Sequence, residues 1–112
     1  MIDTNRPLIV KEVNKIQKEY GSYVKVTADL ETGWVVIGTE LHADGEKILL
    51  EKGSKQDNIW GGGINFKDKM VDMTAVLNLR PRLSNTGLEI IDPQRRKKFE
   101  EICKVIFQEL WK

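Results

Sequence analysis

The sequence predicts an α+β fold in two layers, with a four-stranded antiparallel sheet packed against an N-terminal and a C-terminal helix. Two observations carry this prediction. Near each end, apolar residues recur at three- and four-residue spacing, the period of an amphipathic helix. Between the ends, four segments either alternate apolar and polar residues or are rich in β-branched and aromatic residues, as strands are.

The first helix is expected over residues 7–20, because its apolar residues share one stripe and Gly21 supplies a stop. Residues 23–30 then alternate with the period of a strand that is buried on one face. A turn at residues 31–33 leads to a second strand over residues 34–41. The two strands are therefore expected to pair as an antiparallel hairpin.

The segment after His42 has two interpretations. Asp44-Gly45 is a strong hairpin turn signal, but Asp44 is equally suited to cap a short helix that ends before Gly53. We favour the short helix, which would lie between the two hairpins of the sheet.

A second hairpin is expected from residues 58–66 and 70–80, with a turn at residues 67–69. Three consecutive glycines, residues 61–63, are expected to weaken or bulge its first strand, or to let a neighbour approach the backbone closely.

The chain from residue 81 to residue 91 has the composition of a loop, and Asp92-Pro93 gives a helix start. With both long helices on one face of the sheet, the other face is expected to be polar and open to solvent. A subunit interface is the alternative use of that face.

The length of 112 residues fits one compact domain, which we place at residues 1–112. The net charge of +1 provides no broad basic field, so nucleic-acid binding would need a local patch. A single cysteine, Cys103, excludes an internal disulfide and favours a reducing compartment. Neither a membrane span nor a secretory signal is present, so a soluble cytoplasmic protein is expected.

Ionisable side chains occupy every second position from residue 40 to residue 46, as Glu40, His42, Asp44 and Glu46. With Asp57, the first three are candidate ligands for a divalent metal ion that activates water. Glu40 and His42 are the catalytic candidates, since the ordinary pKa of His42 suits proton transfer near neutrality. Structural roles are the alternative: Asp44 as a helix cap, Glu46 in a first helical turn and His42 bonded to backbone.

A second group of residues has the chemistry of an anion site. Its ligand-binding candidates are Asn78, Arg80, Arg82, Asn85 and Trp60. Guanidinium groups grip phosphate or carboxylate through two parallel hydrogen bonds. Four cations at residues 95–98 also oppose the dipole of the last helix, a conflict that a bound anion would relieve. The alternative is that nearby acids offset these cations and that Trp60 belongs to the core.

Three motifs in this order resemble a small prokaryotic family of unknown function over nearly the whole chain. They are Glu40-Leu-His42-Ala-Asp44, Gly53-Ser54-Lys55-Gln56 followed by Trp60-Gly61, and Asn78-Leu79-Arg80-Pro81. The resemblance implies a stand-alone domain and brings no activity, cofactor or catalytic residue with it. The three glycines after Trp60 depart from the pattern.

The sequence is compatible with three functions, only one of which is enzymatic. The first is a binding or interaction module for an anionic partner, either a small molecule or a nucleic acid, held by Arg80 and its neighbours. The second is a metal-dependent hydrolase or nuclease that uses Glu40, His42 and Asp57. The third is a structural protein that forms homo-oligomers.

Overall fold

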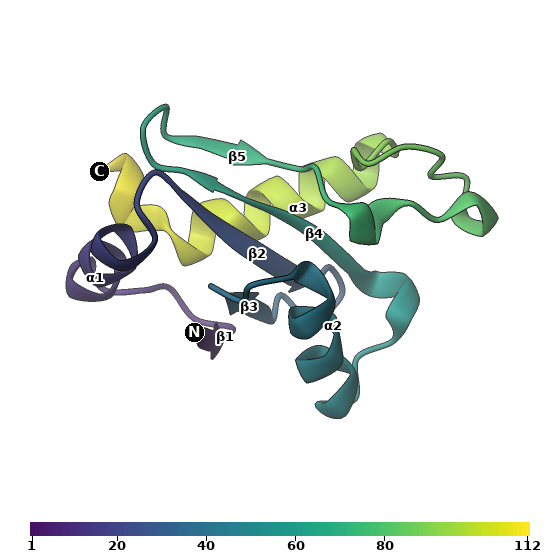
Figure 1. The fold of residues 1–112 in the computed structure, drawn as a ribbon, viewed down its shortest axis with the longest axis horizontal. Helices are drawn as coiled ribbons and strands as arrows, with labels where there is room; N and C mark the ends of the chain where they lie inside the picture. The colour runs from purple at the N-terminus through teal and green to yellow at the C-terminus, as the bar shows by residue number, and fades with distance from the viewer.

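The computed structural model describes residues 1–112 and shows an α+β fold around one antiparallel sheet of five strands in the order β1-β3-β2-β4-β5 (Figure 1). The strands are β1 (Ile2–Thr4), β2 (Tyr23–Asp29), β3 (Val35–Ile37), β4 (Ile59–Asn65) and β5 (Met70–Asp72). The helices are α1 (Val10–Tyr20), α2 (His42–Glu51) and α3 (Pro93–Ile106), with short 3-10 turns η1 (Gln56–Asn58), η2 (Val76–Asn78), η3 (Pro81–Leu83) and η4 (Gln108–Trp111).

The predicted α+β class is confirmed, but the count of four strands is wrong. The fifth strand is β1, which pairs with β3 so that Ile2 lies opposite Ile37. A strand of three residues is too short for an alternating pattern to reveal it, and its partner β3 is equally short.

The two long helices cover one face of the sheet, as the sequence predicted. Val13 and Ile16 of α1 and Phe99, Cys103 and Ile106 of α3 join the apolar side chains of that face in one buried cluster. Burial raises the pKa of the Cys103 thiol, so this cysteine is a core residue and a poor nucleophile.

The second face is not the open polar surface that the sequence predicted, because α2 packs on it (Figure 1). Gly45 of α2 lies directly on Thr27, and Leu49 packs with Val36 and Ile59 in a smaller apolar cluster. Thr27 and Asp29 are consequently buried under the helix. The sheet therefore has helices on both faces, and only part of its second face remains accessible.

The short helix after His42 is confirmed, while the strand expected up to residue 41 ends at Ile37. Gly38 turns the chain with a positive φ of 85°, and its carbonyl accepts a hydrogen bond of 2.9 Å from the Tyr20 hydroxyl. Asp44 is the third helical residue rather than the cap itself. Its carboxylate accepts the Leu41 N–H at 3.1 Å and so satisfies a donor at the helix start.

The strand expected over residues 70–80 also ends early, at Asp72. After Asp72 the chain no longer pairs with β4. Instead it forms two isolated antiparallel bridges with residues further along the chain, Thr74 with Glu89 and Arg80 with Asn85. Residues 73–91, here called the 73–91 excursion, thus replace the long straight strand. Apolar residues continue to alternate after Asp72, although the chain no longer pairs with the sheet there.

The glycine run of β4 neither breaks nor bulges the strand, which pairs with β2 at seven consecutive positions. Close approach is what the glycines permit. A Cβ on Gly61 would lie 2.9 Å from Cδ2 of His42, and one on Gly62 would meet the Phe99 ring at 2.8 Å and overlap the Asp72 carbonyl oxygen.

No helix of the structure combines the length and the apolar character needed to cross a membrane.

We expect Gly62→Ala to lower the free energy of unfolding by about 3 kcal/mol or more, because its methyl group overlaps backbone as well as the Phe99 ring. Gly87→Ala is the matched control, since no atom lies within 4 Å of a Cβ at that position. Urea denaturation of both variants is the measurement. A Gly62→Ala variant as stable as Gly87→Ala would contradict the close packing of β4.

Candidate functional site

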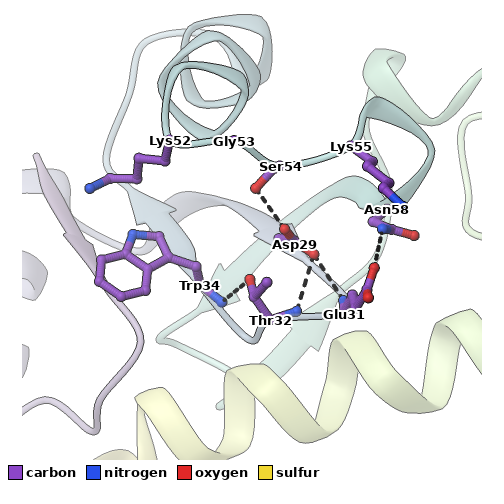
Figure 2. A pocket seen from close by; sticks show the side chains of 9 residues that line it. All are labelled: Asp29, Glu31, Thr32, Trp34, Lys52, Gly53, Ser54, Lys55 and Asn58. Atoms are coloured by element: carbon purple, nitrogen blue, oxygen red, sulfur yellow. Dashed lines mark hydrogen bonds between the residues drawn. The ribbon is translucent and has the colours of Figure 1, made fainter.

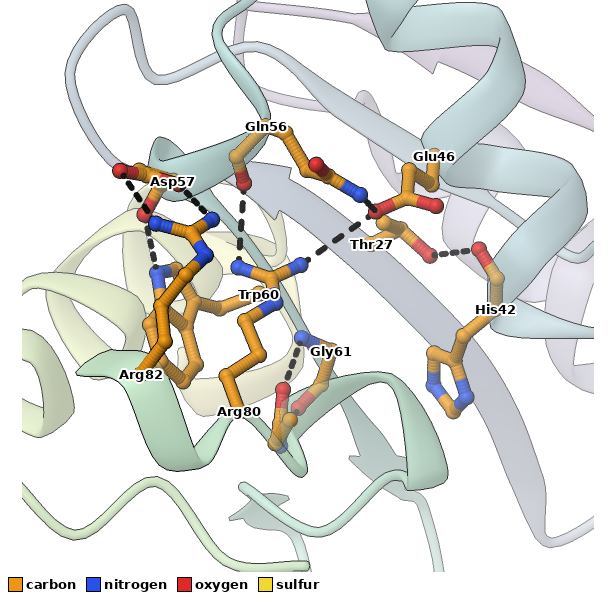
Figure 3. A network of polar contacts seen from close by, with 10 residues as sticks. Thr27, His42, Glu46, Gln56, Asp57, Trp60, Gly61, Arg80 and Arg82 are labelled. Atoms are coloured by element: carbon orange, nitrogen blue, oxygen red, sulfur yellow. Dashed lines mark hydrogen bonds and ion pairs between the residues drawn. The ribbon is translucent and has the colours of Figure 1, made fainter. Parts of the chain in front are cut away.

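A group of arginines surrounds Trp60, the second residue of β4 (Figure 3). The guanidinium carbons of Arg80 and Arg95 each lie 4.8 Å from the centre of the indole ring. Trp60 itself is completely buried, and its Nε1–H donates to the Asp57 carbonyl at 2.9 Å. The tryptophan therefore supports the arginines and offers no free ring face to a ligand.

Arg80 connects the 73–91 excursion to α2. Its guanidinium donates to the Gln56 carbonyl at 3.0 Å and pairs with the Glu46 carboxylate at 3.3 Å. The two side chains are only 9% and 17% exposed, so the pair is shielded from solvent. Burial lowers the pKa of the Arg80 guanidinium from its ordinary value, and the nearby cations act in the same direction.

Arg82 pairs with Asp57 through both carboxylate oxygens, one of them at 3.3 Å. This pair is on the surface, with side chains 62% and 52% exposed. The hydrogen bond from Arg82 lowers the pKa of the Asp57 carboxyl, and the same bond raises the pKa of Arg82. Asp57 is thus already engaged by a guanidinium group.

Arg95 differs from these two arginines. Its side chain is partly buried and donates to the Leu83 carbonyl at 3.3 Å, yet no ion pair of the protein includes it. Arg95 lines an open hollow of about 580 Å³ together with Lys98, which is also without a carboxylate partner. The remaining walls come from the start of α3, the turn after β2 and the η1 region.

Two predicted ligand-binding residues are used inside the fold. The amide of Asn78 accepts the Gly61 N–H and donates to the Gly61 carbonyl, both at 2.9 Å, so it pairs with β4 as a neighbouring strand would. Asn85 donates to the carbonyls of Asn78 and Glu89 at 2.8 Å. Both side chains are buried and hydrogen-bonded to backbone, so we assign them a structural role.

His42 lies at the start of α2, against the glycine run (Figure 3). Its Nε2 is 2.7 Å from the Gly62 carbonyl oxygen, which requires a proton on Nε2. Burial lowers the pKa of His42 below its ordinary value of 6.5, and Lys25 adds to that shift. The Gly62 hydrogen bond and Asp72 oppose it. Tyr23 donates to Asp72 at 2.8 Å, on the accessible part of this face.

The proposed metal ligands are not brought together. No three His, Cys, Asp or Glu side chains in the structure lie close enough to hold an ion. Glu40 is exposed in the loop after β3, Asp44 bonds the start of α2, and Asp57 belongs to the Arg82 pair. His42 points away from Asp57 (Figure 3). Glu40 and His42 do not share one side of a strand, because β3 ends at Ile37 and His42 begins α2.

The structure brings Trp60, Arg80 and Arg82 close together, while their role in ligand binding stays a prediction. The sequence analysis did not include Glu46 or the Gln56 carbonyl in that group. Nothing in the spacing of Glu46 indicates a partner thirty-four residues later in the chain. The sequence analysis noted Arg95 only as one of four cations near the start of the last helix.

A family of proteins of unknown function, DUF5674, has a model that matches residues 3–106. The chain belongs to this family. No curated protein and no solved structure matches the chain. The region that matches the DUF5674 family contains the arginine group, which consists of Arg80, Arg82 and Arg95, and it ends at the last residue of α3. Family membership brings no known activity to these residues.

We expect Arg80→Met to lower the free energy of unfolding by about 2–3 kcal/mol, because it leaves a shielded Glu46 carboxylate without its cation. Arg82→Met is the control: it breaks an exposed pair, which contributes little to stability. Chemical denaturation distinguishes the two. Equal effects of both substitutions would show that Arg80 does not bridge α2 and the 73–91 excursion.

The pKa of His42 predicts a pH dependence of stability. A folded pKa below 6.5 means that the unfolded chain binds the proton more readily, so His42 destabilises the fold as the pH falls through that range. We expect the free energy of unfolding to fall less steeply between about pH 8 and about pH 5 in His42→Gln than in the unmodified protein. The glutamine amide retains a donor for Gly62. Parallel pH profiles of the two proteins would contradict the neutral, buried histidine.

Proposed function

We propose that this protein is a binding domain for an anionic small molecule, held in the hollow beside Trp60. The observation that carries the proposal is Arg95, a partly buried guanidinium group without a carboxylate partner at the wall of that hollow. Arg80 and Arg82, by contrast, have their charges balanced by Glu46 and Asp57. A ligand anion would give Arg95 the partner that the fold does not supply.

The position of Arg95 suits this role. Its guanidinium is held between the Trp60 ring and the Leu83 carbonyl, which fixes it before a ligand arrives. Lys98 lies nearly one helical turn further along α3 and lines the same hollow, so a second cation is available to the same anion. Arg80 does not line the hollow, and its charge is balanced by Glu46.

The hollow also contains acidic groups that limit what it accepts. The Asp92 carboxylate caps α3 and accepts a hydrogen bond of 2.9 Å from the backbone N–H of Arg95. Glu31 accepts a hydrogen bond of 2.7 Å from Asn58 on the opposite wall. A ligand that combines an anionic group with hydroxyl or amine donors matches both walls.

A small molecule fits better than a nucleic-acid strand. The volume of about 580 Å³ is typical of small-molecule sites. Single-stranded nucleic acid binds through exposed aromatic rings, and the ring of Trp60 is completely buried.

The test is calorimetric titration with inorganic phosphate, pyrophosphate, a nucleoside monophosphate and a short oligonucleotide. We expect Arg95→Met to weaken the binding of the preferred ligand about tenfold or more, since a charge-assisted hydrogen bond is lost. Lys97→Met is the matched control, because Lys97 is exposed on the same helix and does not line the hollow. Identical affinities for Arg95→Met and Lys97→Met across the whole panel would end this proposal.

A further inference from the structure

A second hollow, with a volume of about 300 Å³, continues the hollow beside Trp60 along α3. Three residues line both of them, Leu30, Glu31 and Lys98, so the two hollows meet at these side chains. Together they form one trough, here called the α3 trough, with α3 on one side and the turn after β2 on the other. The second hollow is also of small-molecule size.

The helix side of the α3 trough changes in character along its length. Four residues at spacings of three and four lie on one face of the helix and line the trough: Arg95, Lys98, Ile102 and Val105. The first two are cationic and the last two are aliphatic. Val105, which is 51% exposed, is about 15 Å from Arg95 along the helix axis.

The second hollow lies directly on the hydrophobic core. Leu30 and Ile106 line it, and both are buried members of the main core cluster. Ile102 is partly buried and packs against the same cluster. An apolar ligand group in this hollow would cover the aliphatic surface that these side chains leave to water, which is favourable.

The wall opposite α3 is the turn after β2, and hydrogen bonds hold it in place (Figure 2). The buried Asp29 carboxylate accepts from the Ser54 hydroxyl at 2.6 Å, the Glu31 N–H at 2.9 Å and the Thr32 N–H at 3.2 Å. The Glu31 carboxylate accepts a hydrogen bond of 2.7 Å from Asn58 (Figure 2). The trough is therefore formed before a ligand arrives, which lowers the entropic cost of binding.

The charges of the α3 trough determine the direction in which a ligand lies. Arg95 and Lys98, at one end, have no carboxylate partner. Glu101 lines the second hollow and has no cation partner. An anionic group is attracted to the first end and repelled from the second. The trough thus favours a molecule that is anionic at one end and apolar at the other.

We propose that the ligand is a single-chain amphiphile, an alkyl carboxylate or alkyl phosphate, with its head group at Arg95 and its chain along Ile102 and Val105. This inference rests on the function proposed above, because the head group is the anion that Arg95 binds. A hydroxyl group next to the head group is compatible with the same arrangement, since it would meet Glu31 where the two hollows join. A nucleotide fits less well, because it would place polar ring edges against aliphatic side chains.

Calorimetric titration with two homologous series tests the proposal. The ligands are butanoate, hexanoate and octanoate, and butyl, hexyl and octyl phosphate, all below the concentrations at which they form micelles. We expect the affinity of the better series to rise about twofold with each added CH₂, because a methylene in an open trough loses about half of its contact with water. Octyl trimethylammonium, with the same chain and the opposite charge, is the control and is expected not to bind. The series that binds more tightly identifies the head group.

The methyl signals of a protein labelled with ¹³C at valine locate the chain. The octyl ligands are expected to shift the Val105 signals, whereas inorganic phosphate leaves them in place because its site is at Arg95. Val105→Thr assigns these signals by removing them, and it should weaken the binding of the octyl ligands about threefold, since a hydroxyl replaces a methyl group. Val10→Thr is the matched control, because Val10 is 56% exposed on α1 and lines neither hollow.

The outcomes separate this inference from the function proposed for Arg95. If butyl and octyl ligands bind equally well, and both bind more weakly to Arg95→Met, the anion site stands and the amphiphile is excluded. If no member of either series binds, both proposals fail. A dependence on chain length that is unchanged in Val105→Thr, or that octyl trimethylammonium shares, would be unspecific adsorption and would overturn the inference as well.

Discussion

The close approach of neighbouring groups to the glycine run of β4 sets where the outer layers of this protein lie on its sheet. His42 rests on Gly61 from one face, and Phe99 rests on Gly62 from the other. Ordinary side chains at these positions would push α2 and α3 outward and open the buried clusters on both faces. The glycines lower the intrinsic stability of the strand, since glycine loses more conformational entropy on folding and has no side chain to pack. The seven paired residues of β2 compensate by holding β4 in register along its whole length.

The arginine group follows from the same strand. Because β5 ends at Asp72, the backbone of Gly61 has no strand beside it on the side away from β2, and the Asn78 amide fills that place with two hydrogen bonds. The amide fixes the 73–91 excursion against β4 one residue beyond Trp60. Arg80, two residues after Asn78, is thereby directed toward the indole ring and Glu46. A structural amide thus determines where the Arg80 guanidinium lies.

The sequence predicted those parts of the fold that depend on local chemistry. The helix start at Asp92-Pro93 is a property of neighbouring residues, and Asp92 does cap α3. The limits of β3 and β5 depend instead on partners far along the chain, such as the Tyr20 hydroxyl that binds Gly38. Periodicity cannot report such contacts, so both strands were predicted too long. The early end of β3 also removed the alignment of Glu40 and His42 on which the metal hypothesis rested.

For the candidate sites, the sequence identified residue types but could not separate surface side chains from internal ones. The arginines and asparagines near Pro81 were grouped as an anion site, which stays a prediction. Sequence does not distinguish a buried amide from an exposed one, and Asn78 and Asn85 are internal. The indole Nε1 of Trp34 is buried and has no hydrogen-bond partner. The sequence does not indicate this, since whether an indole N–H finds an acceptor depends on the packing of α2 over β3. Such a donor is visible only when every other buried polar atom has been matched to a partner.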